Sequence, residues 1–476
     1  MRILLIEPPF ARFMGFYRFF FPFSLASLAA YLKKEGHQIL IYDADHAGKP
    51  INMTSTKLLD VFHQYLDGIK NLHHPIWQEV ETIIKDFNPD LIGITYLSTK
   101  TGSVKNIINI SKKLYPQVPI VLGGAHASVL FKSSLEQSQA DFVVLGEGEK
   151  TFSELIQKIQ SGNTDFENIQ GLAFRSAQGK IVTTPHRELL KDLDSLPFPD
   201  RDSLYRLDTY RPDDLSMIMT SRGCPYNCAF CSSIWERRAR DRSISNIVAE
   251  IEYLIERFKT KNIYFKDDTF TLSRKRIFEF CNTLKQKNIQ VAWECLTRIE
   301  LIDEELIMRM RQAGMVYLKI GIESGSQRLL DTANKKVTIS EIKKGAAILN
   351  KLGQKWSAFF MIGYPDETET EIHMSHKLIE EIRPTYVSMS TLVPYPGCQY
   401  YHELKDLGVL NKDTNWNLYD PFSIYANVNQ VIDKKRFQTL VYETMKFIDD
   451  YNLHSGEKSP KITSGKEITN HYERKE

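Results

Sequence analysis

Three cysteines close together carry the clearest chemistry in the sequence. Cys224, Cys228 and Cys231 stand in the segment CPYNCAFC, directly after an apolar run that predicts a β-strand. Three thiolates on one tight loop can ligate three irons of a four-iron cluster. The fourth iron then has no protein ligand, and a small molecule can bind it. The spacing therefore predicts a 4Fe–4S cluster with one open iron.

The other uses of cysteine fit the sequence less well. A structural zinc site needs four ligands, usually from paired CxxC spacings, whereas Cys281, Cys295 and Cys398 stand alone. Isolated cysteines are usually small core residues, and we assign these three no role. All six cysteines follow residue 223, which is not the distribution of a disulfide framework. A reducing, cytoplasmic compartment is expected.

The cysteine loop follows the first of six apolar runs that alternate with helix-like segments. These runs are 216–221, 262–268, 291–297, 316–324, 357–363 and 386–394. Six βα units with short loops predict a partial (βα)6 barrel of parallel strands. The site of such a barrel lies at the carboxyl ends of its strands. The segments with chemical potential fall at those ends.

A CxxxCxxC segment in this position resembles the radical S-adenosylmethionine (SAM) superfamily, and the resemblance covers about residues 215–400. It implies that the amino and carboxylate groups of the methionine moiety chelate the open iron. An electron from the cluster then splits SAM to give a 5′-deoxyadenosyl radical. The reaction requires an electron donor such as flavodoxin or ferredoxin.

The same resemblance assigns barrel residues to SAM. Carboxylates suit an ammonium group, although two adjacent acids outside this context are usually a helix cap or a solvated pair. A lone arginine or glutamate is likewise usually a surface charge. The implied contacts are Phe230 near the adenine, Asp267 and Asp268 at the methionine amino group, Arg298 at its carboxylate, and Glu323 and Ser324 at the ribose hydroxyls.

The N-terminal half shows a second alternation of strands and helices. Short β-rich runs occur at 3–8, 38–44, 90–95, 119–124 and 141–149, with helices expected between them. This order predicts a doubly wound, Rossmann-like parallel sheet. Between Asp45 and Pro89 the sequence becomes polar and helical, as in an insertion, and 170–185 predicts a hairpin.

Glycine-bearing turns follow three of these strands, where a doubly wound sheet binds its ligands. Alone, such turns are tight connections of any α/β protein. Followed by a radical SAM barrel, they resemble those of the cobalamin-binding radical SAM enzymes of the class B methyltransferase type. The residues that this resemblance assigns to cobalamin are Thr95, Leu97, Gly123, Gly124, Gly146, Glu147 and Gly148.

One departure concerns the lower ligand of cobalt. Many cobalamin proteins carry Asp-x-His-x-x-Gly, whereas this chain has DADHAG at 43–48, with different spacing. We expect His46 to be a loop histidine and leave the lower face of cobalt unassigned.

The expected domains follow from these patterns. They are a cobalamin-binding domain (1–165), a hairpin and linker (166–212), a radical SAM barrel (213–400), a helical extension (401–452) and a disordered tail (453–476). The 61 basic and 59 acidic residues leave a formal charge of +2, which argues against nucleic acid as a partner. No transmembrane span or signal peptide is expected.

The resemblance implies an enzyme that moves a methyl group from SAM, through methylcobalamin, to an unactivated carbon or phosphorus of a small-molecule or lipid substrate. A radical cyclase or rearrangement enzyme with the same cofactors remains an alternative, because no motif separates the two. A methylthiotransferase would carry three further N-terminal cysteines, and residues 1–223 have none. A non-catalytic cobalamin sensor would leave the three-cysteine loop unexplained.

Overall fold

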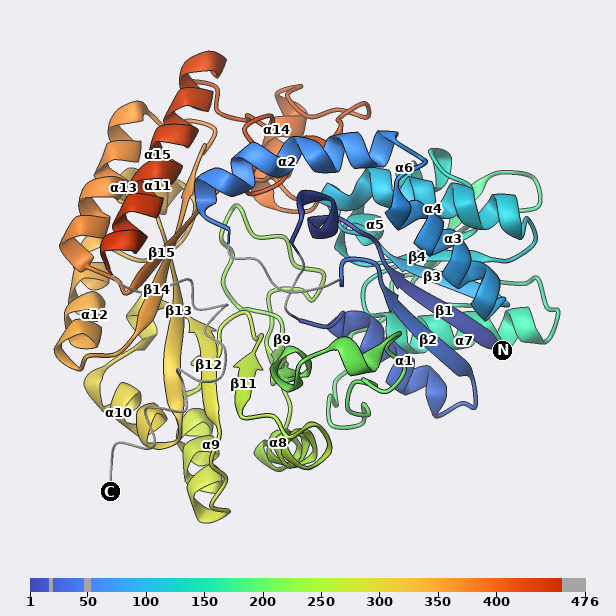
Figure 1. Cartoon of the computed structure of the whole chain (residues 1–476), viewed down its shortest axis with the longest axis horizontal. Coiled ribbons are helices and arrows are strands. Elements are labelled where there is room, and N and C mark those ends of the chain that lie inside the picture. Colours follow the sequence, from blue (N-terminus) through green and yellow to red (C-terminus); the bar gives the residue numbers. More distant parts are fainter. Residues whose placement is uncertain (17–19, 47–52, 456–476) are drawn as a thin grey trace.

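The computed structural model describes residues 1–16, 20–46 and 53–455, which form two α/β lobes side by side (Figure 1). In the N-terminal lobe the strand order is β2-β1-β3-β4-β5-β6-β7. The first five strands pair in parallel, and the hairpin β6–β7 continues the sheet antiparallel. The strands are β1 (Arg2–Glu7), β2 (Gln38–Asp43), β3 (Leu91–Thr95), β4 (Ile120–Gly123), β5 (Phe142–Val144), β6 (Leu172–Arg175) and β7 (Ile181–Thr183).

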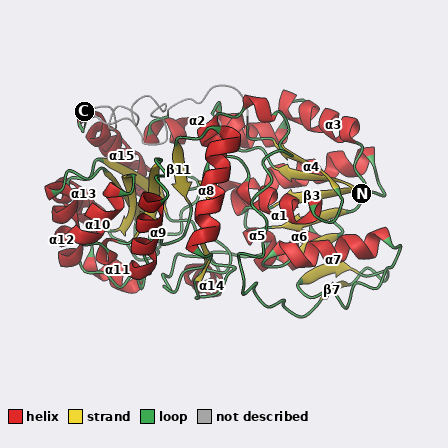
Figure 2. Cartoon of the chain, turned by 90° about the horizontal axis from the view of Figure 1, so that it is seen from below, coloured by secondary structure: helices red, strands yellow, loops and turns green. Residues whose placement is uncertain are grey.

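Helices cover both faces of this sheet, as Figure 2 shows. On β1, Ile3 and Leu5 belong to one buried cluster and Leu4 and Ile6 to another, because successive side chains of a strand point to opposite faces. The first face is covered by α1 (Phe23–Lys33) and α7 (Gly148–Gln160), and the second by α3 (Pro75–Phe87) and α4 (Thr101–Leu114). This two-sided burial confirms the doubly wound sheet.

The helix expected between the runs at 119–124 and 141–149 is instead two short helices, α5 (Ala125–Val129) and α6 (Phe131–Glu136). Leu130 between them leaves helical geometry, with φ −106° and ψ 35°. The hydroxyls of Ser133 and Ser134 both donate to its carbonyl oxygen, and such bonds compete with the regular helical pattern.

The second lobe confirms the partial barrel. Its six parallel strands lie in chain order, from β8 at one edge to β15 at the other. They are β8 (Met217–Ile218), β11 (Asn262–Phe265), β12 (Ala292–Thr297), β13 (Met315–Glu323), β14 (Trp356–Ile362) and β15 (Tyr386–Thr391). The helices between and after them are α8 (Ile244–Phe258), α9 (Arg274–Gln286), α10 (Glu304–Gln312), α11 (Gln327–Thr332), α12 (Ile339–Lys351), α13 (Glu369–Ile382) and α14 (Gln399–Asp406).

The first barrel strand is shorter than the expected 216–221. After Ile218 the chain turns away, and β9 (Ser221–Arg222) pairs antiparallel with β10 (Arg240–Asp241). Asp267 causes this turn, because its buried carboxylate accepts hydrogen bonds from the backbone N–H of Thr220 and from the hydroxyls of Thr220 and Ser221. These hydrogen bonds therefore fix the residues from which the cysteine loop begins.

The polar segment after β2 joins the two lobes. It forms α2 (Ser55–Lys70), which runs between them in Figure 1, and α3. Asp449 of the long C-terminal helix α15 (Lys434–His454) accepts hydrogen bonds from the N–H groups of Ser55 and Thr56, at 2.7 and 2.9 Å. The predicted insertion is thus an anchor for the C-terminal helix.

The C-terminal extension is only partly helical. Between α14 and α15 the chain is irregular apart from one 3-10 turn (Trp416–Leu418). The tail expected to be disordered was 453–476, but Leu453 and His454 still belong to α15, and the residues after Ser455 lie outside the described part of the chain. No helix in the described ranges is both long and apolar enough to span a membrane.

Candidate functional site

The cysteine loop begins at a position that only glycine can occupy. Gly223, directly before Cys224, has φ +89°, and a Cβ there would lie 2.3 Å from the carbonyl oxygen of Arg238. The chain therefore turns sharply out of β9 into the three-cysteine segment.

Backbone contacts on both sides hold this loop in place. The N–H of Ala229 donates to the Ala333 carbonyl at 2.8 Å, and the Ala229 carbonyl accepts from the N–H of Tyr400 at 3.1 Å. Arg237 donates to the carbonyl oxygens of Tyr226 and Cys231, at 3.1 and 2.9 Å. The loop's shape is thus set by its neighbours at the carboxyl end of the barrel.

The sulfur atoms lie in a partly buried, cationic setting. Arg298 donates to Cys228 Sγ at 3.6 Å, and its guanidinium lies 3.8 Å from the ring centre of Tyr226. Burial raises the pKa of Cys231, and the neighbouring Arg237 opposes that effect. These arginines favour thiolates, which are the ligand form of cysteine.

The three thiols suit a cluster better than a single ion. Within the described ranges, no three His, Cys, Asp or Glu side chains converge on one metal position. A four-iron cluster takes one thiolate on each of three irons, so its ligands need not converge. All three cysteines are free thiols, and the residues present fit the cluster.

Three of the residues assigned to SAM meet at Lys335, which sequence reasoning missed. Its Nζ donates to Glu323 at 2.7 Å and lies 6.0 Å from the ring centre of Phe230, while its carbonyl oxygen accepts from Arg298. Lys335 is 5% exposed. Lys335 lies in no motif and in no expected strand or helix of the sequence analysis, so the sequence alone did not indicate it.

Glu323 is held in an uncommon conformation. It has φ +75°, in the left-handed region, and the pairing of β13 with β14 shifts register between Gly321 and Glu323. Such irregularities re-aim side chains and cluster at functional sites. The ion pair with Lys335 directs the Glu323 carboxylate toward the cysteine loop.

The remaining assigned residues differ in accessibility. Asp267 is buried and its carboxylate is engaged by Thr220 and Ser221, whereas Asp268 is exposed. Although the residue is exposed, its carboxyl group is partly desolvated by the surrounding site, and this desolvation and the adjacent Asp267 raise the pKa of Asp268. Ser324 is fully buried, and its hydroxyl oxygen accepts from the N–H of Ser326. The SAM contacts of these residues stay predictions, and Asp268 is the better placed of the two acids.

The turns assigned to cobalamin lie at the carboxyl edge of the N-terminal sheet. Thr95 pairs with Gly123, and Leu97 follows two residues later, beside the β1–β3 position where the strand order reverses. Gly124 has φ +100°, and a Cβ there would lie 3.2 Å from Thr95 Oγ1. A Cβ at Gly123 would meet nothing within 4 Å. The edge therefore combines close backbone packing with open space, which fits a bulky ligand.

Glu147 in the third turn is engaged across the two lobes. Its carboxylate accepts from Arg222 at 2.9 Å, from Arg240 at 2.9 and 3.1 Å, and from the N–H of Leu190 at 2.8 Å. Glu149 binds Arg222 at 2.6 Å. Gly146 and Gly148 flank Glu147, so this turn is joined to the cysteine loop through Arg222. Contacts of the turn with cobalamin stay a prediction.

Two further features define the edge. His46 follows the edge strand β2 by three residues and so does not lie at the strand-order reversal. Its ring stacks on Tyr210, with ring centres 3.7 Å apart, and contacts Thr209. Lys100, which no motif indicated, is fully buried and forms ion pairs with Glu7 and Asp45 at the ends of β1 and β2.

Comparisons with known proteins agree with this geometry. The sequence matches the Radical SAM superfamily over residues 218–379 and the B12 binding domain over residues 16–156. It is 32% identical over 348 residues to an uncharacterized methyltransferase of Pyrococcus horikoshii, covering 72% of this chain and 75% of that protein. It is 29% identical to the anaerobic magnesium-protoporphyrin IX monomethyl ester cyclase of Rubrivivax gelatinosus, spanning 69% of this chain but only 60% of that enzyme.

The fold is also that of a solved structure. OxsB, described as a cobalamin-dependent S-adenosylmethionine radical enzyme with aqua-cobalamin and S-adenosylmethionine bound, superposes with a TM-score of 0.69 at 16% identity. The superposition covers 99% of this chain and 70% of OxsB. A cysteine loop at the carboxyl end of a six-stranded partial barrel defines a radical SAM enzyme. With its N-terminal B12 binding domain, the chain belongs to the cobalamin-dependent radical SAM enzymes.

Proposed function

We propose that the chain transfers a methyl group from SAM to an unactivated carbon or phosphorus of a small-molecule or lipid acceptor. The observation that carries the proposal is the junction of the two lobes, where the cobalamin-side turn of Glu147 is bonded to Arg222, two residues before Cys224. This contact supports a cobalamin site that lies next to the cysteine loop. Relatives named as methyltransferases support methyl transfer as the reaction type.

When bound, the cluster and cobalamin supply the radical and methyl-carrying chemistry. Cys224, Cys228 and Cys231 hold the cluster, and Arg298 stabilises the thiolate of Cys228 through its N–H to sulfur contact. Glu323, held by Lys335, offers a carboxylate to hydroxyl groups of SAM. The protein thereby orients the reactants and excludes water.

The direct test uses protein reconstituted anaerobically with its cluster and cobalamin, a chemical reductant, SAM with a labelled methyl group, and a small-molecule extract of the source cells as the supply of acceptor. We expect both 5′-deoxyadenosine and S-adenosylhomocysteine, and the label in the acceptor. The first product reports radical formation and the second reports methyl transfer from SAM. Deoxyadenosine without S-adenosylhomocysteine, or an unlabelled product, would overturn methyl transfer.

A cyclase reaction is the second candidate, favoured by the 29% identity to the Rubrivivax gelatinosus enzyme. It predicts a product that lacks the methyl label, so the same experiment separates the two. An electron donor such as flavodoxin or ferredoxin is part of the proposal, because the cluster must be reduced. We also propose the reducing cytoplasm as the compartment, since all six cysteines of the sequence are free thiols.

A further inference from the structure

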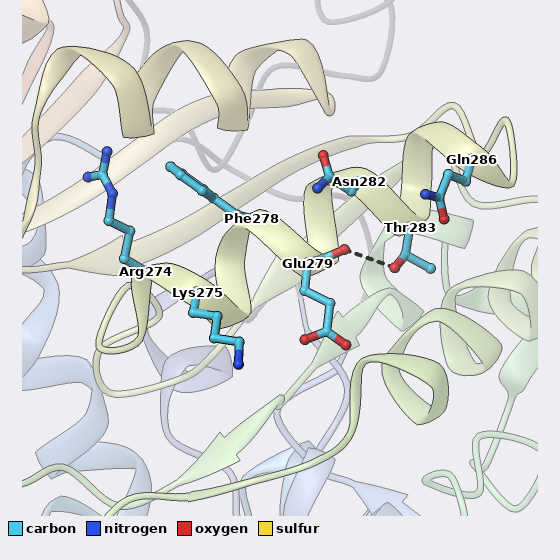
Figure 3. A pocket seen from close by; sticks show the side chains of 7 residues that line it. All are labelled: Arg274, Lys275, Phe278, Glu279, Asn282, Thr283 and Gln286. Carbon is cyan, nitrogen blue, oxygen red and sulfur yellow. Dashed lines mark hydrogen bonds between the residues drawn. The ribbon is translucent and has the colours of Figure 1, made fainter.

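Figure 3 shows a hollow on the outer face of α9, and all of the residues that line it belong to this one helix. Arg274 there forms ion pairs with Asp303 and Glu305, and its side chain is 41% exposed. No second element of the described chain encloses the hollow, so it carries no ligand site. Arg274 is thus an ordinary surface arginine of the barrel, in contrast to Arg298.

Arg298 follows β12 directly and is 5% exposed. Each of its three guanidinium nitrogens has a partner. Nε donates to the carboxylate of Glu300, one terminal nitrogen donates to Cys228 Sγ at 3.6 Å, and the other donates to the carbonyl oxygen of Lys335. The guanidinium carbon lies 3.8 Å from the ring centre of Tyr226. Because the guanidinium is a rigid, planar fork, these contacts together fix one N–H toward the sulfur.

These partners bear on the role that the family resemblance implies for Arg298. A guanidinium binds a carboxylate best through two parallel N–H bonds from a pair of its nitrogens. In Arg298 both nitrogens of every such pair already have partners. The methionine carboxylate of SAM would therefore compete with bonds that are already made.

The turn after α11 holds Arg298 and the cysteine loop together. Next to the Ala333 carbonyl that bonds this loop, the side-chain nitrogen of Asn334 donates to the Asn227 carbonyl of the same loop at 2.7 Å. The carbonyl oxygen of the following residue, Lys335, accepts from Arg298. Asn334 has φ +51°, in the left-handed region, which asparagine adopts more readily than most residues. Three consecutive residues thus bond either the cysteine loop or its arginine.

A hydrogen bond to a sulfur ligand affects how easily a cluster is reduced. Reduction adds one negative charge to the cluster and its thiolates, and a cationic donor interacts more strongly with the more negative state. Hydrogen bonds to the sulfurs are among the factors that set the reduction potential of iron–sulfur clusters. Since Arg298 and Cys228 are both buried, solvent ions screen their interaction little.

We propose that Arg298 acts on the cluster rather than on SAM: it is a positioning residue that holds an N–H against the Cys228 sulfur and thereby raises the reduction potential of the cluster. Glu300, Tyr226 and the carbonyl oxygen of Lys335 fix its orientation. The inference goes beyond the proposed function, because it concerns the reduction that precedes any methyl transfer. Its tests need no methyl acceptor.

The first test is a redox titration of the reconstituted proteins without SAM, with dithionite as the reductant and electron paramagnetic resonance of the reduced cluster as the readout. Arg298→Gln removes both the charge and the fork of N–H groups, whereas Arg298→Lys keeps the charge without the fork. At the wild-type midpoint potential we expect the ratio of reduced to oxidised cluster to fall about tenfold in Arg298→Gln, or about 59 mV for one electron. In Arg298→Lys the ratio falls less.

The matched control is Arg274→Gln, which removes a guanidinium from the outer face of α9 (Figure 3) and leaves the midpoint potential unchanged. Wild-type potentials in both Arg298 variants would overturn the proposal. If Arg298→Gln holds no cluster, the potential of Arg298→Lys decides in the same way.

The second test asks whether Arg298 instead binds the methionine carboxylate. Equilibrium dialysis compares the affinity for SAM with that for decarboxylated SAM, which lacks only this carboxylate. We expect the wild type and Arg298→Gln to show the same ratio of the two affinities. A ratio that falls to one in the variant would assign Arg298 to the carboxylate and overturn the proposal. A merely structural role would weaken both ligands alike and leave the midpoint potential unchanged, which also contradicts it.

Discussion

Replacing Glu147 with glutamine is expected to loosen the cysteine loop, although residue 147 belongs to the other lobe. Its carboxylate is the shared partner of two largely buried guanidinium groups, those of Arg222 and Arg240, whose side chains are 12% and 8% exposed. A neutral amide leaves Arg240 without its counter-ion. Arg222 retains Glu149, at 2.6 Å.

The size of the effect follows from this arrangement. Removing one partner of a buried ion pair costs about 3–5 kcal/mol, and because Glu149 remains we take the lower value, about 3 kcal/mol. Since about 1.4 kcal/mol is a factor of ten, local opening becomes roughly 150-fold more frequent. Hydrogen exchange of the backbone amides of the cysteine loop measures this opening.

The matched control is Glu154→Gln in α7, the helix that begins directly after Glu147. Glu154 pairs with Arg187, but its side chain is 44% exposed, and exposed pairs contribute only about 0–1 kcal/mol. We expect exchange in the cysteine loop to be unchanged there. The reasoning is refuted if Glu147→Gln accelerates exchange of this loop no more than Glu154→Gln does. Adding Arg240→Met to Glu147→Gln is expected to restore part of the loss, because the unpaired charge is gone.

Three further outcomes are expected at the barrel. Changing all three loop cysteines to alanine abolishes the cluster's absorption and electron paramagnetic resonance signals together with deoxyadenosine formation; a variant that still cleaves SAM would remove the basis of the assignment. Asp268→Asn removes an exposed carboxylate and weakens SAM binding about tenfold or more, because a hydrogen bond to a charged group contributes about 1.5–3 kcal/mol. The iron content stays unchanged. Equilibrium dialysis measures the SAM affinity, and an unchanged affinity contradicts the assignment. Glu323→Gln leaves Lys335 buried without its counter-ion and lowers the thermal unfolding midpoint as well as SAM affinity; a loss of stability alone would show that Glu323 only supports the fold.

The architecture could be predicted because it depends on local periodicity. The apolar runs of β1, β12 and β13 are buried on both faces almost throughout. Helices separate the barrel strands, so their order along the chain gives their order in the barrel sheet. Boundaries were less predictable where a distant side chain decides them. Asp267 bonds Thr220 where β8 ends early, and two serine hydroxyls bond the carbonyl oxygen of Leu130 where the helix divides.

The residues of the candidate site likewise fall into those that the sequence could predict and those that it could not. The cysteines could be found because their ligand spacing is local, as could the glycines that follow strands. Lys335 and Arg222 could not, because their partners are 12 and 75 residues away in the sequence and no repeat connects them. Glu147 shows the limit of local reasoning: its place in a turn predicts a cofactor contact, which stays a prediction, and gives no sign that its carboxylate is bonded by Arg222 and Arg240 of the other lobe.

The shared ionic network has a consequence for cofactor loading. The turn that carries Glu147 borders the edge assigned to cobalamin, and Arg222 precedes the cysteine loop by one glycine. If cobalamin binding orders this turn, it stabilises the bonded conformation of Arg222, because a ligand favours the state that it binds. We therefore expect cobalamin alone to slow hydrogen exchange in the cysteine loop before any cluster is built. Coupling is reciprocal, so cluster assembly should tighten cobalamin binding by the same factor. Both effects should weaken in Glu147→Gln, where only Glu149 still bonds Arg222, and equal slowing in that variant would show that the two sites communicate by another route.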